Sequence, residues 1–246
     1  MRIEKMHSWN VSPKEAQEIQ LDLRKHWIGE DRLPAIRSVA GADVAFVLTG
    51  SQALRPRPTR SLLREANRAI AGVIVYRFPE MEEVERADAV RPLRFPYVPG
   101  LLSFRECPVL LAAFAKLRQA PDLIFCDAHG YAHPRRFGLA CHLGLLLNRA
   151  TIGCAKSRLI GAEGLPPRKA GAWAPLMDED ETIGAVLRTR DGVRPIYVSQ
   201  GHRVNLASAI RLTLDVCDGL RIPRPTRDAD QYVRDLKRKL LGAPGR

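Results

Sequence analysis

The stretch that decides the fold spans residues 95–142 and reads FPYVPGLLSFRECPVLLAAFAKLRQAPDLIFCDAHGYAHPRRFGLACH. Two prolines flank Tyr97 near its start. Because proline fixes its own dihedral and biases the preceding residue to extended backbone, this loop should hold Tyr97 at a fixed angle. Apolar residues then recur at helical spacing between 103 and 117, which predicts a helix. The apolar run 122–127 that follows is typical of a buried central strand ending in a carboxylate, Asp127.

Three of these positions also allow ordinary structural interpretations. Ser103 and Glu106 fit a capping box, in which the glutamate returns a hydrogen bond to the helix start. Asp127 could cap the turn after its strand, and Tyr97 could be a rim aromatic. However, a glutamate near a helix start and an aspartate at a strand tip, 21 positions apart, can converge on one hard cation. A third carboxylate would strengthen this second interpretation.

The third carboxylate is Asp43. It lies in the middle of residues 39–48, an otherwise apolar run that predicts the first strand. An ionised carboxylate inside a central strand is costly unless it is paired or bound to a metal, so we favour a functional role for Asp43. Asp43, Glu106 and Asp127 are therefore the candidate metal ligands.

Length and composition place the chain among globular proteins. It has 246 residues, 46% of them hydrophobic, and neither an internal repeat nor a long linker divides it. Its apolar runs are all shorter than the roughly 18 residues that a membrane span needs, and the N-terminus lacks a secretory apolar core, so we expect a cytoplasmic protein without membrane contact. Five cysteines, with no Cys-x-x-Cys pair, favour reduced core thiols over zinc or disulfides.

The formal net charge is +12, with 31 arginines and 8 lysines. Because forked guanidinium groups suit phosphate, nucleic acid is a favoured partner, although basicity alone leaves a generally basic surface open. Residues 49–68 are rich in Arg, Ser and Pro. This segment predicts a surface insertion or a mobile loop, and an arm that contacts a nucleic-acid backbone is a further interpretation.

Local patterns predict alternating helices and strands. Ser12, Pro13 and Glu15 combine an N-cap, a first-turn proline and a capping-box acid, which indicates a helix start. The remaining predictions are strands at 39–48, 70–78 and 83–90 in an antiparallel meander, helices at 137–147, 205–218 and from about 226 to 242, strands at 150–155, 183–188 and 195–199, and a loop at 161–171. The last two strands should form a hairpin. Together these elements predict an α/β fold in which helices flank a mixed sheet.

Six motifs follow one another along the chain: GADVAF around Asp43, FPYVPGLLSFRE ending at Glu106, DAHGYAHPRRFGLACH from Asp127, TIGCAKSRL around Lys156, GHRV around His202 and PRPTR at 223–227. Over about residues 39–238 they resemble the endonuclease V family. The resemblance implies one catalytic domain (1–246) with a ribonuclease H-like fold. It also implies Mg²⁺-dependent nicking, with Mn²⁺ as a substitute, at the second phosphodiester bond 3′ to deoxyinosine, leaving 3′-hydroxyl and 5′-phosphate ends.

The resemblance further implies roles for individual residues. The family's catalytic positions are matched by Asp43, Glu106 and Asp127, which bind metal, and by Lys156 and His202 near the scissile phosphate. Tyr97 matches a wedge tyrosine that fills the gap left in the stack by a damaged base. The segments that close around the everted hypoxanthine are matched by Gly100, Leu102, Ala128, Gly130 and His133. If the motifs are set aside, the ordinary interpretation of Lys156 is a solvated lysine at a strand end, and that of His202 is a residue of a turn.

The chain departs from the family's pattern in two places. Ala128 stands where the family usually has glycine, so its methyl group could narrow the base pocket. Residues 49–68 form a longer connection than is usual. His129 and His133 are spaced like a zinc-protease pair, but the glycine and proline beside them argue against a helix, so we expect no zinc site.

Three alternative functions compete with this prediction. A non-catalytic nucleic-acid-binding protein of the same fold has no reason to place three acids beside phosphate. A Holliday-junction or RNA-hybrid nuclease has no need of the tyrosine wedge. Some members of the family prefer inosine in RNA, so an inosine-specific endoribonuclease stays open. We expect a monomer whose partner is DNA containing deoxyinosine, or inosine-containing RNA.

Overall fold

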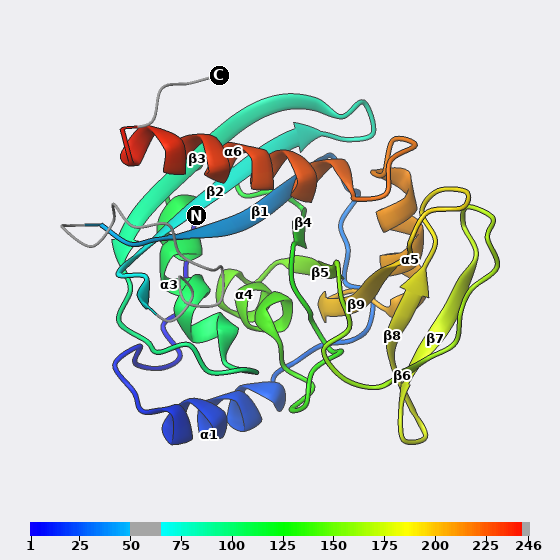
Figure 1. Cartoon of the computed structure of the whole chain (residues 1–246), viewed down its shortest axis with the longest axis horizontal. Helices are drawn as coiled ribbons and strands as arrows, with labels where there is room; N and C mark the ends of the chain where they lie inside the picture. Colours follow the sequence, from blue (N-terminus) through cyan, green and yellow to red (C-terminus); the bar gives the residue numbers. More distant parts are fainter. Residues whose placement is uncertain (50–64, 243–246) are drawn as a thin grey trace.

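The computed structural model describes residues 1–49 and 65–242 (Figure 1). Its helices are α1 (Pro13–Arg24), α3 (Leu102–Phe114), α4 (Leu139–Leu147), α5 (Leu206–Asp215) and α6 (Arg224–Leu240). Its strands are β1 (Ser38–Val47), β2 (Arg68–Arg77), β3 (Glu82–Pro92), β4 (Leu123–Cys126), β5 (Ala150–Ala155), β6 (Ala162–Glu163), β7 (Trp173–Asp178), β8 (Glu181–Leu187) and β9 (Ile196–His202). Most of the predicted basic insertion at 49–68 lies outside the described residues. At its described ends, the side-chain amide of Asn67 donates to the Thr49 carbonyl at 3.1 Å.

The strands of the described chain form one mixed sheet, in the order β3-β2-β1-β4-β5-β9-β8-β7-β6. The predicted antiparallel meander is confirmed, because β2 pairs with both β1 and β3 in antiparallel register. β1, β4 and β5 run parallel, and β9 returns antiparallel to β5. The predicted pairing of the last two strands is also confirmed, since β8 and β9 are antiparallel neighbours.

The region between 161 and 178 differs from the prediction. The expected loop contains the two-residue strand β6, and β7 follows where no strand was predicted. β7 contains Pro175, and Leu176 is its only buried residue, so it shows neither an apolar run nor a clear alternation. Its pairing with β8 across the turn at residues 179–180 makes it a strand. Tertiary pairing, which the sequence pattern does not show, explains the difference.

Helices cover both faces of the sheet (Figure 1). Val39 and Ala40 are neighbours in β1, yet they join different hydrophobic clusters because successive strand residues point to opposite faces. The cluster around Ala40 includes apolar residues of α3 and α4. The cluster around Val39 includes those of α5, and α6 lies across β1 and β2 on the same side. The fold is thus a three-layer α/β sandwich.

Gly41 sets the position of α6. A Cβ atom at this residue would lie 1.9 Å from the carbonyl oxygen of Pro225, so only glycine allows the start of α6 to cross β1 this closely. Asp43 follows two residues further along β1. The close crossing therefore brings α6 next to the first candidate acid.

All five cysteines are buried free thiols, as their number and spacing predicted. In residues 1–49 and 65–242, no helix has both the length and the apolar character to cross a membrane.

Candidate active site

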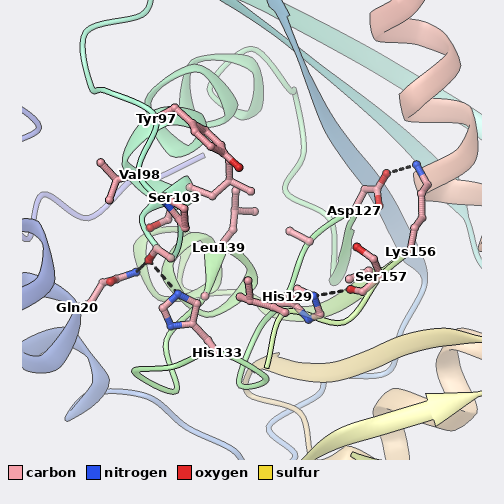
Figure 2. A pocket seen from close by; sticks show the side chains of 17 residues that line it. Gln20, Tyr97, Val98, Ser103, Asp127, His129, His133, Leu139, Lys156 and Ser157 are labelled. Atoms are coloured by element: carbon pink, nitrogen blue, oxygen red, sulfur yellow. Dashed lines mark hydrogen bonds and ion pairs between the residues drawn. The ribbon is translucent and has the colours of Figure 1, made fainter. Parts of the chain in front are cut away.

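Three of the predicted site residues, Asp43, Asp127 and Lys156, lie where the parallel strands β4 and β5 end beside β1. Cys126, the last residue of β4, pairs with Ala42 in β1, so Asp127 comes next to Asp43 where β4 ends. The backbone N–H of Asp127 donates to the Ala42 carbonyl at 3.5 Å. Lys156 follows β5 directly, and its ammonium forms an ion pair with the Asp127 carboxylate (Figure 2). The parallel order β1-β4-β5 thus brings the three side chains together.

Glu106 reaches the same place from α3. Burial, followed by the charges of Asp43 and Asp127, raises the pKa of Glu106 well above its usual value. Burial, followed by the charge of Asp127, raises the pKa of Asp43 to about 7. Burial also raises the pKa of Asp127, although the ion pair with Lys156 opposes this effect. The three acids therefore share a poorly solvated space, in which Asp127 makes Asp43 harder to ionise and both aspartates make Glu106 harder to ionise.

The donor chemistry of this group fits a hard divalent cation. Among the residues that the structure describes, no three His, Cys, Asp or Glu side chains are grouped closely enough to enclose a metal ion as they stand. Mg²⁺, however, is usually held by one or two carboxylates and keeps several waters, so it does not need a closed protein cage. A bound cation would offset the repulsion among the acids, as the Lys156 ammonium already does for Asp127.

The raised pKa of Asp43 predicts a dependence of stability on pH. The folded protein keeps a proton on Asp43 up to about pH 7, whereas the unfolded chain loses it near the usual value of 3.8. Because the folded state binds more protons in this window, the free energy of unfolding of the metal-free protein should fall as the pH rises from about 4 to 7. Thermal unfolding in a chelator measures this slope. It should be smaller in Asp43→Asn, and an identical slope in both proteins would contradict the prediction.

The start of α3 decides between the two interpretations of Glu106. The N-cap of the helix is Leu101, which makes no side-chain capping bond, and Ser103 already lies in the first turn. The Ser103 hydroxyl is instead 3.0 Å from Nδ1 of His142. The capping-box interpretation is therefore wrong for this helix. The acids that Glu106 faces remain the explanation for its position.

A cavity of about 310 Å³ opens beside the Asp127–Lys156 pair. Figure 2 shows Tyr97 across the pocket from this pair, with the turn after β4 between them. Tyr97 is 38% exposed, so its ring is available to a ligand. Among the predicted substrate-binding residues, the cavity is lined by Tyr97, Gly100, Leu102, Ala128 and His133. A concave, largely apolar site of this size beside charged groups suits one flat base.

Ala128 fits its turn without strain. It is absent from the residues of the described chain that have positive φ, so glycine is not required at this position. Its side chain is 6% exposed and belongs to the cluster around Ala40, although it also lines the cavity. Gly130 does not line the cavity. A Cβ atom there would lie 2.0 Å from the carbonyl oxygen of Gln200, so this glycine serves the packing of the turn against β9.

His202 lies away from the other predicted catalytic residues. It pairs with Thr151 in β5, whereas Lys156 follows that strand's other end, roughly 16 Å further along the chain direction. The His202 side chain is buried, and its Nδ1 accepts a hydrogen bond from the Ile28 N–H at 3.3 Å. Burial, helped by Arg203, lowers the pKa of His202 to about 4. The structure therefore does not bring His202 to the three acids, and its ring holds the segment after α1 against β9.

Sequence patterns missed a fourth acid, Asp230 in α6. Its charge adds to the effects of burial and of Asp127 that raise the pKa of Asp43. Arg234, one turn further along the helix, pairs with Asp230 at 2.7 Å. The residue was overlooked because its helix is strongly basic. The signal that could have found it is an acid directly after the buried Ala229, at the sheet-facing side of the helix.

The fold and the site together define a class of protein. A mixed sheet flanked by helices, with carboxylates and a lysine gathered on adjacent parallel strands beside a base-sized cavity, is the arrangement of a ribonuclease H-like nuclease. The family model for Endonuclease V matches residues 21–231, and the chain belongs to the endonuclease V family. It is accordingly a nuclease, and the family is one of generally metal-dependent nucleases.

Relatives and solved structures agree with this assignment. Endonuclease V of Roseiflexus castenholzii is 46% identical over 224 residues, which cover 91% of this chain and 93% of the relative. The crystal structure of Endonuclease V from Streptomyces avermitilis has a TM-score of 0.84 at 37% identity and covers 98% of this chain and 100% of its own. Endonuclease V of Ciona intestinalis, in complex with a 24mer DNA containing an inosine followed by a ribo-adenosine, has a TM-score of 0.74 at 26% identity, with 92% and 98% covered.

Proposed function

We propose that this protein nicks DNA at the second phosphodiester bond 3′ to deoxyinosine, using Mg²⁺, with Mn²⁺ as a substitute, and so begins the repair of deaminated adenine. The observation that carries the proposal is the cavity that opens directly beside the Asp127–Lys156 pair. It places a base-sized pocket next to the groups that suit phosphodiester hydrolysis. The inosine-containing DNA bound by the Ciona relative supports the same substrate.

Asp43, Glu106 and Asp127 would hold the metal. When bound, a divalent ion lowers the pKa of a water and neutralises charge that develops at phosphorus. In the hydrolysis, the water oxygen bonds to phosphorus and the bond to the 3′ oxygen breaks. The products are a 3′-hydroxyl, which takes up a proton, and a 5′-phosphate.

Lys156 contributes a fixed positive charge. Burial opposes its ionisation, but the hydrogen bond and charge of Asp127 outweigh this effect and raise its pKa overall. Lys156 therefore stays protonated at neutral pH, so it can donate hydrogen bonds but cannot act as a base. An ammonium next to Asp127 is well placed to stabilise the negative charge of the phosphate in the transition state.

Tyr97 links recognition to the chemistry. Its loop is bounded by prolines and leads directly into α3, the helix that carries Glu106. An aromatic ring on such a loop can enter the base stack when the damaged base swings into the cavity. The guanidinium of Arg105 lies 5.9 Å from the centre of the Tyr97 ring and donates to the Phe95 carbonyl at 2.7 Å. The loop is thus supported from within α3.

Asp230 should tune the affinity for the metal. Replacing Asp230 with Asn removes one negative charge near Asp43, so the Mg²⁺ concentration for half-maximal nicking should rise about fivefold, the effect of losing roughly 1 kcal/mol of charge interaction. A titration of initial rates with Mg²⁺ measures this. Asp235→Asn is the matched control, because Asp235 lies on the same helix and pairs with Arg238. Equal Mg²⁺ requirements in the two variants would exclude Asp230 from the site.

We infer a monomer as the active species. We further infer a single catalytic unit across residues 1–246 and a cytoplasmic location, where the five free cysteines would stay reduced. A non-catalytic nucleic-acid-binding protein explains the site less well. Buried acids would repel the phosphates of a nucleic acid unless a cation is held between them.

A nicking assay on matched inosine-containing DNA and RNA tests the proposal. With Mg²⁺, the DNA duplex should be cut and the corresponding DNA without inosine should not. Faster cutting of the RNA would instead indicate RNA as the physiological substrate. The Ciona complex makes this outcome worth testing, because its DNA carries a ribonucleotide, ribo-adenosine, after the inosine. Binding without any cutting, in Mg²⁺ or in Mn²⁺, would overturn the proposed enzyme.

A further inference from the structure

The carbonyl oxygen of Gly100 is held by three side chains. Arg135 Nη2 donates to it at 2.7 Å, His133 Nε2 at 2.9 Å and Gln20 Nε2 at 3.2 Å. Gly100 has a φ of 78°, in the region that favours glycine, and it joins the Tyr97 loop to Leu101, the N-cap of α3. The direction of this one peptide therefore affects both the loop and the helix start.

Gln20 is the centre of this arrangement. It lies on α1, 80 positions before Gly100 in the chain, and its side chain is 1% exposed. Besides the bond to Gly100, its Nε2 donates to the Phe137 carbonyl at 3.0 Å, and its Oε1 accepts from Arg135 Nε at 2.6 Å. This buried amide therefore ties the backbone at Gly100 and at Phe137 to α1, and it also fixes the orientation of the Arg135 guanidinium.

His133 serves the same clamp through both ring nitrogens. Nε2 donates to the Gly100 carbonyl, and Nδ1 accepts from the Arg135 backbone N–H at 3.1 Å. Burial, helped by the charge of Arg135, lowers the pKa of His133 to about 4, which agrees with the neutral ring that this pattern needs. Neither nitrogen is left to read a base, so the substrate contact expected for His133 gives way to a positioning role.

We infer that Gln20, His133 and Arg135 form a clamp that positions the damage-recognition loop, and that Gln20 is a specificity-determining residue although it lies outside the catalytic group. Gln20 and His133 also line the cavity, and Figure 2 shows both on the side opposite Lys156. The inference rests on the proposed function, because the pocket wall that the clamp fixes is the wall expected to hold hypoxanthine. The clamp orders the loop before the substrate binds, so its loss should weaken recognition more than catalysis.

The test compares Gln20→Leu with Gln20→Glu and with Gln17→Leu. Leucine preserves much of the side-chain volume but removes all three hydrogen bonds, whereas glutamate keeps the acceptor for Arg135 and loses the two donated bonds. Gln17 is exposed on the same helix, so Gln17→Leu controls for the changed helix surface. Thermal unfolding first establishes which variants are folded. Nicking kinetics then give KM and kcat, and binding in Ca²⁺ compares a duplex containing one deoxyinosine with the same duplex containing deoxyadenosine.

Gln20→Leu should raise KM for inosine-containing DNA about tenfold and lower the preference for inosine over adenine in binding by a similar factor, with kcat at saturation within about twofold of wild type. Gln20→Glu should lie between wild type and Gln20→Leu, and it decides the question if the leucine variant does not fold. If both Gln20 variants keep the KM and the preference of Gln17→Leu, or lose only kcat, the inference is wrong. If wild type and Gln17→Leu do not cut inosine-containing DNA at all, the proposed function fails first.

Discussion

Replacing any one of Asp43, Glu106 and Asp127 with its amide should reduce Mg²⁺-dependent nicking by at least about 10³-fold, because the metal then loses a ligand and part of its positioning, the usual basis of catalysis in such sites. The three acids come from β1, α3 and the end of β4; Asp127 raises the pKa of Asp43, and both aspartates raise that of Glu106. Initial rates on an inosine-containing duplex measure the loss. Asp215→Asn, a change to an exposed acid on α5, should leave the rate unchanged.

The same three variants should fold, and this separates lost chemistry from lost structure. Removing a poorly solvated acid relieves desolvation and repulsion, so the metal-free Asp43 and Glu106 variants should be at least as stable as wild type at neutral pH. Asp127→Asn also loses the ion pair with the half-exposed Lys156, which should cost about 1 kcal/mol or less. Thermal unfolding in a chelator compares them. A variant that turns over normally would remove its residue from the site, and one that unfolds near room temperature would show that its carboxylate is structural.

The second large effect concerns Tyr97. Tyr97→Ala should weaken binding to a duplex containing deoxyinosine by roughly 1–3 kcal/mol, the usual worth of one base–aromatic stack, which corresponds to about a 5- to 150-fold rise in Kd. The loss should shrink on single-stranded or mismatched inosine, where less stacking must be replaced. Binding in Ca²⁺, which should support binding without cleavage, measures both substrates.

Tyr97→Phe is the matched control, because it keeps the ring and removes only the hydroxyl. It should bind the duplex nearly as wild type does. Since Tyr97 is 38% exposed and lies across the cavity from Lys156, neither variant should change the dependence of the rate on Mg²⁺. Equal losses on paired and unpaired inosine, or no loss on either, would make Tyr97 a packing residue rather than a wedge.

Local patterns predicted much of the sheet. Residues 123–126 are apolar throughout because β4 is buried on both faces, and Asp127 follows them where the chain reaches the site. Asp43 could be singled out because an acid inside an apolar strand needs a partner. Both signals are local, and the parallel pairing of β1 with β4 then places the two residues side by side.

The residues that sequence reasoning missed or misplaced depend on long-range packing. His202 sits in a motif, but only the register of β9 against β5 shows that it lies at the far end from Lys156. In the sequence, Asp230 is one acid within a basic helix. Its proximity to Asp43 depends on the crossing of α6 over β1, which Gly41 allows. Gln20 resembles any polar residue of an amphipathic helix, and its burial follows from contacts 80 and 117 positions away. No local pattern encodes such partners.

The most direct test of the proposed function uses two end-labelled DNA duplexes that differ at one position, deoxyinosine in one and deoxyadenosine in the other. Each is incubated with the purified protein and Mg²⁺, and the cut is mapped to the nucleotide. We predict a single nick in the inosine strand, at the second phosphodiester bond on its 3′ side, with 3′-hydroxyl and 5′-phosphate ends and no comparable cut in the adenine duplex. Equal cutting of both duplexes, or none of either with Mg²⁺ or Mn²⁺, would contradict it.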